Sequence, residues 1–177
     1  SAEEIAERVL RELRKVTKEV AEEDERVLRE DEKVTDEVRK EDKRVLDEAR
    51  KVIDDVRKKG IPEEVLRRAE EVLERLRRKS EEILKESKKS TETSRRESEK
   101  VLRDSEDSIR ELEERAKKTK VDEEVVKRVR ENVKRTRELS KRSVEKNEEN
   151  VRRTREMSKR TVKEIRDVVK ELRDRVK

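Results

Sequence analysis

Residues 23–40 read EDERVLREDEKVTDEVRK, and residues 41–58 repeat the pattern as EDKRVLDEARKVIDDVRK. The alignment places Val27 with Val45 and Leu28 with Leu46, 18 residues apart. An α-helix has about 3.6 residues per turn, so 18 residues make about five whole turns. Such a repeat keeps one face apolar without the supercoil that a heptad imposes. The stretch therefore predicts a long, nearly straight amphipathic helix.

The 18-residue spacing continues through the chain, in three sets of repeats that cover residues 5–58, 65–118 and 126–177. Gly60 suits the left-handed residue that ends a helix, and Pro62 suits the first position of the next one. Asp122 suits the N-cap of a third helix. We therefore expect an all-α, single-chain, up-down-up three-helix bundle. Its predicted extent is one domain over residues 1–177, with helices at about 2–58, 62–118 and 123–177.

The segment SKKSTETSRRES, residues 87–98, contains no apolar side chain and at first sight looks like a linker. A helical projection places Ser87, Thr91, Ser94 and Ser98 between the apolar edges of the helix. The neighbouring repeats carry mostly Ala, Leu and Ile at the same positions. The hydroxyl groups thus replace core residues in register, which predicts the middle of a helix with a polar buried face.

Matching polar residues occupy core positions on the other two predicted helices. Asp24, Asp31 and Asp42 stand where other repeats carry Ala or Leu, and Thr35 stands where they carry Ile. Antiparallel folding brings each aspartate level with hydroxyl and amide groups from the other helices. The predicted layers are Asp24 with Ser94, Ser98, Ser143 and Asn147; Asp31 with Ser87, Ser90, Thr91, Asn150 and Thr154; and Asp42 with Ser80, Ser158 and Thr161. A carboxylate accepts hydrogen bonds, and an unpaired buried polar group costs about 1–3 kcal/mol. We therefore expect buried hydrogen-bond networks, with drier cores in the outer repeats.

The composition argues against several classes of function. The chain has no His, Cys, Phe, Tyr or Trp, which removes zinc fingers, thiol nucleophiles, Ser-His-Asp triads and base stacking. Its 55 basic and 50 acidic residues are interspersed, whereas nucleic-acid binding favours basic residues gathered on one face. No segment approaches the roughly 20 apolar residues of a membrane span, and no targeting signal is recognisable. We expect a soluble protein that binds neither nucleic acid nor membranes.

The buried aspartates are also candidates for general acids or metal ligands. Catalysis would require paired groups and a cavity, and a hard cation would require several carboxylate oxygens. With one carboxylate in each layer, the sequence predicts a structural role, no catalytic or metal-binding residue, no cofactor and no enzymatic activity.

Taken together, these features resemble computationally designed straight three-helix bundles with buried hydrogen-bond networks. The resemblance covers the whole chain and rests on the 18-residue repeats, the GIP and TKVD loops, the charged outer faces and the Ser/Thr/Asn core layers. It departs in its core Asp residues and in its large polar share. It implies a synthetic scaffold without natural activity, localisation or partner. The width of the apolar stripe suits a three-helix monomer, and self-association stays open. The alternative is a designed binding or self-assembly module that uses one helix face.

Overall fold

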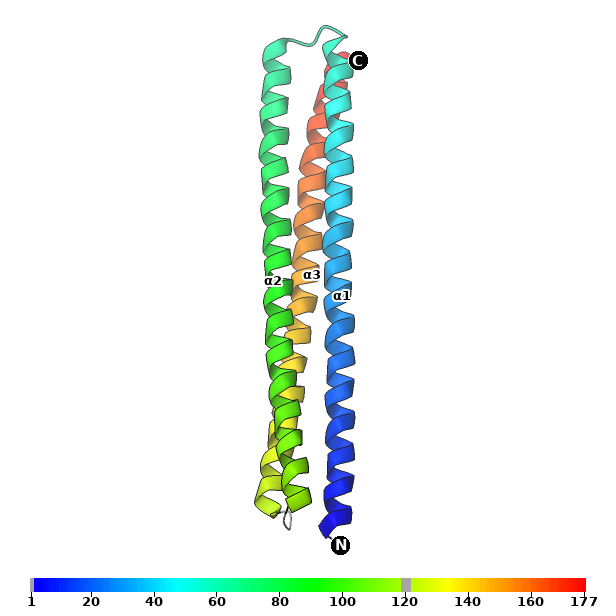
Figure 1. The fold of residues 1–177 in the computed structure, drawn as a ribbon. Helices are drawn as coiled ribbons and strands as arrows, with labels where there is room; N and C mark the ends of the chain where they lie inside the picture. The colour runs from blue at the N-terminus through cyan, green and yellow to red at the C-terminus, as the bar shows by residue number, and fades with distance from the viewer. Residues whose placement is uncertain (1, 119–121) are drawn as a thin grey trace. The chain divides into compact units, whose positions relative to one another are not determined.

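The computed structural model describes residues 2–118 and 122–177, and in these residues it contains three helices and no strand. They are α1 (Ala2–Arg57), α2 (Glu63–Lys118) and α3 (Glu123–Val176) (Figure 1). The predicted helices agree with these bounds to within one residue at each end. The structure therefore confirms the three-helix bundle, and SKKSTETSRRES lies within α2.

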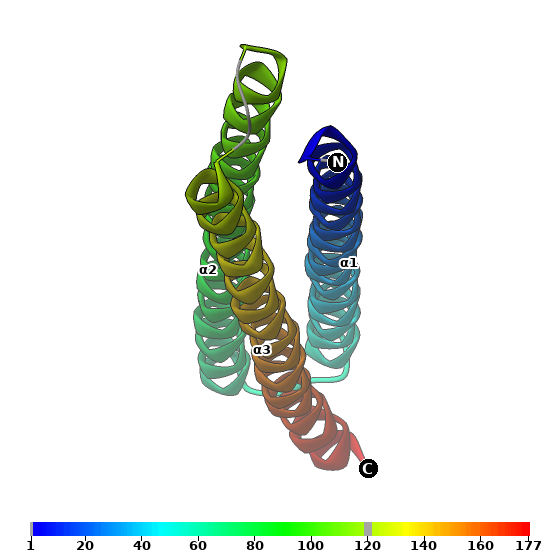
Figure 2. The same ribbon diagram turned by 90° about the horizontal axis from the view of Figure 1, so that it is seen from below.

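The helix ends follow the local sequence. At the start of α3, Asp122 Oδ1 accepts the backbone N–H of Glu124 at 3.1 Å, which is an N-cap interaction. Gly60 lies in the short connection between α1 and α2 with a φ of 84°, in the left-handed region (Figures 1 and 2). Pro62, which was predicted as the first helical residue of α2, instead immediately precedes it, because α2 begins at Glu63. Its carbonyl accepts the backbone N–H groups of Val65 and Leu66, so Pro62 starts the helix from the N-cap position.

The chain divides into two compact units, each of which contains a segment of all three helices. Unit 1 comprises the described residues of 1–30 and 91–148, and unit 2 comprises residues 31–90 and 149–177. Each unit has its own apolar core: Leu112 and Val129 are central in unit 1, and Leu66 and Ile165 in unit 2. All four side chains are at most 1% exposed. The prediction of a single domain stays a prediction.

The outer faces carry ion pairs at helical spacing, such as Arg44 with Glu41 and Glu48. Other pairs join two helices of one unit. Arg137 of α3 lies 3.1 Å from Glu19 of α1. Exposed ion pairs contribute about 0–1 kcal/mol each, so burial and not surface charge supplies most of the stability.

Candidate functional site

In unit 1, the carboxylate of Asp24 on α1 lies between serine hydroxyl groups from the other two helices. Ser98 of α2 donates a hydrogen bond to Oδ2 at 2.5 Å, and Ser140 of α3 donates to Oδ1. All three side chains are buried. Hydrogen bonds from a hydroxyl to a carboxylate are charge-assisted and about 2.5–2.7 Å long, so this arrangement is strong. We call these three residues the Asp24 cluster.

Unit 2 contains a second cluster with the same bonding pattern, the Asp42 cluster. Ser80 of α2 donates to Asp42 Oδ2 at 2.5 Å, and Ser158 of α3 donates to Oδ1 at 2.6 Å. Each of its residues is separated by 18 positions from its counterpart in the Asp24 cluster. The sequence repeat is thus also a repeat of hydrogen-bonding chemistry.

A longer chain of hydrogen bonds crosses unit 2 at Asp31. Asn150 of α3 donates through Nδ2 to Asp31 Oδ1 at 3.0 Å and to Ser87 Oγ at 3.1 Å. Thr35 donates its one hydroxyl proton to the Asp31 carbonyl oxygen. Ser87, whose oxygen lies 2.7 Å from that of Thr35, must therefore be the donor in their contact. The direction of donation along Asn150, Ser87 and Thr35 is fixed by these partners.

Unit 1 contains a related hydroxyl pair that was not among the predicted site residues. Thr17 Oγ1 donates to the Leu13 carbonyl oxygen and lies 3.0 Å from Ser105 Oγ. Ser105 therefore donates to Thr17, as Ser87 does to Thr35. The signal was present in the sequence, because Thr17 and Thr35, and also Ser105 and Ser87, are 18 residues apart.

The layers differ in detail from those predicted. Ser140, which was matched to an apolar position but not assigned to a layer, is the α3 donor to Asp24, and Ser143 is half-buried nearby in sequence. Asn147 is 3% exposed, and its Oδ1 has no hydrogen-bond partner in the described part of the chain. Thr161 donates to the Met157 carbonyl oxygen of its own helix instead of joining the Asp42 cluster. Of the other predicted residues, Thr91, Ser94 and Thr154 are buried and Ser90 is half-buried.

Charged residues next to the two clusters are held by arginines. A hydrogen bond from Arg95 of α2 is the main cause that lowers the pKa of Glu25, and Arg29 adds to it. A hydrogen bond from Arg44 likewise lowers the pKa of Glu41, which precedes Asp42. These carboxylates point outward to cations, whereas the neighbouring aspartates point inward to hydroxyl groups.

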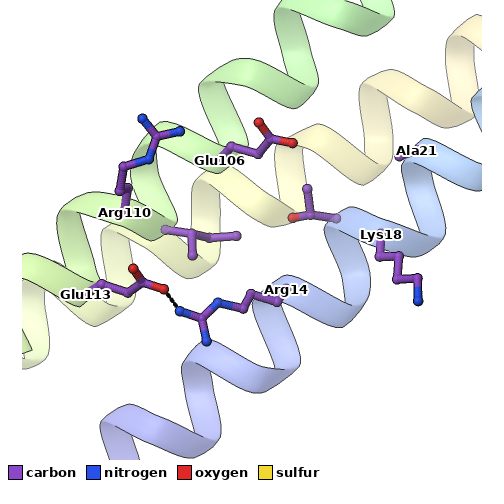
Figure 3. A pocket seen from close by; sticks show the side chains of 8 residues that line it. Arg14, Lys18, Ala21, Glu106, Arg110 and Glu113 are labelled. Atoms are coloured by element: carbon purple, nitrogen blue, oxygen red, sulfur yellow. Dashed lines mark ion pairs between the residues drawn. The ribbon is translucent and has the colours of Figure 1, made fainter.

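Two hollows of unit 1 are large enough to consider as sites. One, of about 440 Å³, lies between α1 and α2 over Thr17 and Ile109. Figure 3 shows that Arg14 reaches across it to an ion pair with Glu113, while Lys18 points away. The other, of about 160 Å³, adjoins Asp24. An internal ion pair spans the first hollow, whereas the second has the Asp24 cluster among its lining residues.

Within the described residues, no group of three or more Asp and Glu side chains is placed to hold a metal ion. No described helix has a stretch long and apolar enough to cross a membrane. Comparisons with protein-family models, with curated proteins and with solved structures find no match to this chain.

Proposed function

We propose that the chain is a designed structural scaffold, in which buried hydrogen-bond networks select one register of three helices. The observation that carries the proposal is the repeated cluster. Asp24 and Asp42 each accept two hydrogen bonds from serine hydroxyl groups, one from α2 and one from α3. Each contact ties α1 to one defined height on α2 and α3. A helix that slips by one turn would leave a buried carboxylate and two hydroxyl groups without partners, at about 1–3 kcal/mol or more for each group.

The networks suit specificity better than stability. Replacing a buried polar triad with well-packed apolar residues is often neutral or stabilising, so such triads are weak evidence for a gain in stability. An 18-residue repeat on three helices also leaves many apolar positions interchangeable, which makes slipped pairings a real competitor. The proposal assigns the chain no catalytic role and no binding of a cofactor, nucleic acid or membrane. It assigns the chain a monomeric state.

The Asp42 cluster allows a direct test with two variants. In Asp42→Ala, Ser80 and Ser158 lose their acceptor, and we expect a loss of stability of about 1–3 kcal/mol for each orphaned hydroxyl. In the triple variant D42A/S80A/S158V, the cluster carries the residues that other repeats place there, namely Ala6, Ala116 and Val176. We expect this variant to recover the stability, and we expect the same replacements at both clusters (D24A/S98A/S140V with D42A/S80A/S158V) to populate more than one register. Denaturant unfolding measures the first effect, and the number of amide signals in a ¹H–¹⁵N NMR spectrum measures the second.

Each variant can contradict the proposal. A variant with both clusters replaced that keeps one sharp set of amide signals would show that the clusters do not select the register. An Asp42→Ala variant as stable as the parent would show that the two serines do not depend on the carboxylate. The surface substitution Asp47→Ala, at an exposed position of the same helix, serves as the control for changing an aspartate.

A further inference from the structure

The hollow beside Asp24 has a polar floor and apolar walls. Its volume is about 160 Å³, and Asp24, Ser98 and Ser140 lie among its lining residues together with half-buried Ser143. Val101 of α2 and Leu139 of α3 supply the apolar part. Three exposed charged residues complete the lining and place its mouth at the surface: Glu97, Arg142 and Lys146.

Comparison with the Asp42 cluster explains why space remains beside Asp24. The position of Val101 is taken by Ile83 near Asp42, and that of Ser143 is taken by Thr161. Each replacement is one carbon larger, and both Ile83 and Thr161 are buried whereas Val101 and Ser143 are half-buried. The sequence thus leaves out two carbon atoms beside one of two clusters that have the same Asp and Ser residues. That difference makes the Asp42 cluster an internal control.

The floor of the hollow is rich in acceptors. Ser98 and Ser140 each donate a hydroxyl proton to the Asp24 carboxylate. Each of the two hydroxyl oxygens keeps lone pairs that can accept a hydrogen bond from a ligand. The described part of the chain places no Lys or Arg nitrogen within 4.0 Å of the Asp24 carboxylate. The two cations of the lining, Arg142 and Lys146, are exposed at the mouth, so the buried floor carries a carboxylate without a directly paired cation. This favours a positively charged donor, because buried charges are normally paired.

From this geometry we propose that the hollow binds a small primary alkylammonium ion, with ethylammonium as the simplest example. An ammonium group has three donors and no acceptor, which matches the acceptors of Asp24, Ser98 and Ser140. Its alkyl group lies against Val101 and Leu139. The size is suitable, since an apolar protein cavity of about 150 Å³ holds a benzene molecule, which has more heavy atoms than ethylammonium.

The charges at the mouth are balanced in the same way at the two clusters, so the difference between them lies in the space beside the carboxylate. Glu97, Arg142 and Lys146 at the mouth beside Asp24 correspond by the 18-residue repeat to Lys79, Arg160 and Glu164, so each set carries two cations and one anion. Lys146 and Arg142 oppose the entry of a cation, so we expect weak, salt-sensitive binding rather than tight binding. Tetramethylammonium is the matched comparison, because it has the same charge but no N–H donor and cannot donate to the oxygens of the floor.

The test is an NMR titration of the whole chain with ethylammonium chloride at neutral pH. We expect saturable shifts of the Asp24 carboxyl carbon and of the Val101 and Leu139 methyl groups. Tetramethylammonium chloride, at the same ionic strength, supplies a cation of the same charge without N–H donors and should give no saturable shift. Equal shifts with the two salts, or equal shifts at Ile83 beside the Asp42 cluster, would overturn the proposal.

Two variants separate the site from a general charge effect. Filling the hollow with V101I/S143T, which copies the side chains around Asp42, should abolish the saturable shifts while Asp24 and its two serine donors stay in place. Asp24→Asn should weaken binding by about tenfold or more, since a hydrogen bond to a charged group is lost. Unchanged binding in the filled variant would contradict the proposal, and its amide spectrum reports separately whether that variant is folded.

Discussion

Asn147 is a buried residue that works against the stability of unit 1. Its side chain is 3% exposed, and its Oδ1 accepts no hydrogen bond from the described residues. The matching positions in the other repeats of α3 carry Val129 and Ile165. An unsatisfied buried acceptor costs about 1–3 kcal/mol, so we expect Asn147→Val to raise the free energy of unfolding by about 1 kcal/mol or more. Urea denaturation would measure the change.

The control for that substitution is Asn150→Val, three residues further along α3. Asn150 donates to both Asp31 and Ser87, so its replacement removes hydrogen bonds instead of relieving an unpaired atom. We expect this variant to be less stable than the parent. If both valine variants shifted the urea midpoint in the same direction, the bonding of the two amides would not be the cause.

Gly60 is a residue whose identity is fixed by its backbone conformation. Its φ of 84° lies in the region that residues with a Cβ adopt at a cost of about 1–2 kcal/mol. A Cβ atom built at this position meets nothing within 4 Å, so Gly60→Ala isolates the backbone effect from steric contact. We expect a loss of stability of about 1–2 kcal/mol in denaturant unfolding. A neutral result would mean that the connection between α1 and α2 can adopt another conformation without loss.

At the scale of the helix, α2 contains an ion pair with a measurable effect on titration. A hydrogen bond from Arg77 is the main cause that lowers the pKa of Glu74 from 4.5 to about 2. A lowered pKa in the folded state means that this pair stabilises the fold above about pH 4.5, and that the contribution is lost as the pH falls through about 2. Arg77→Gln should return the pKa of Glu74 toward 4.5 in a carboxyl ¹³C NMR titration.

Arg78 offers a matched control on the same helix. Its Nε lies 3.4 Å from Glu74 Oε1, and its influence on the pKa of Glu74 is weaker than that of Arg77. Arg78→Gln should therefore shift the titration less than Arg77→Gln does. The opposite order would show that the hydrogen bond from Arg77 is not what lowers the pKa.

The helices could be predicted closely from the sequence because their signals are local. The 18-residue repeat sets the buried face, and Gly60 and Asp122 set the ends, so three helices follow without knowledge of distant contacts. Contacts between helices were less predictable. Ser140 and Ser143 both face inward, yet Ser140 is the donor to Asp24, because a helical projection gives the face but not the height within one turn.

Side-chain competition limits the prediction in the same way. Thr161 was assigned to the layer of Asp42, but its hydroxyl donates to a carbonyl oxygen of its own helix. A threonine in a helix always has such a local acceptor one turn earlier, so burial alone does not show which partner it takes. Thr17 and Ser105 could have been found by transferring the Thr35 and Ser87 pair through the 18-residue repeat.

For the whole molecule, the apolar side chains divide unequally between the two units. In the described residues, unit 2 contains 16 buried apolar side chains, whereas unit 1 contains 12. Each such side chain contributes roughly 1.5–3 kcal/mol on burial, so unit 1 should open at a lower free energy than unit 2. In native-state hydrogen exchange followed by mass spectrometry, we expect the amides around Val9 and Leu112 to exchange faster than those around Ile53 and Leu66.

Leu112→Ala and Leu66→Ala remove equally buried leucines, one from each unit. Leu112→Ala should accelerate exchange in unit 1 and leave unit 2 protected, and equal acceleration of both units by either variant would instead show that they unfold together.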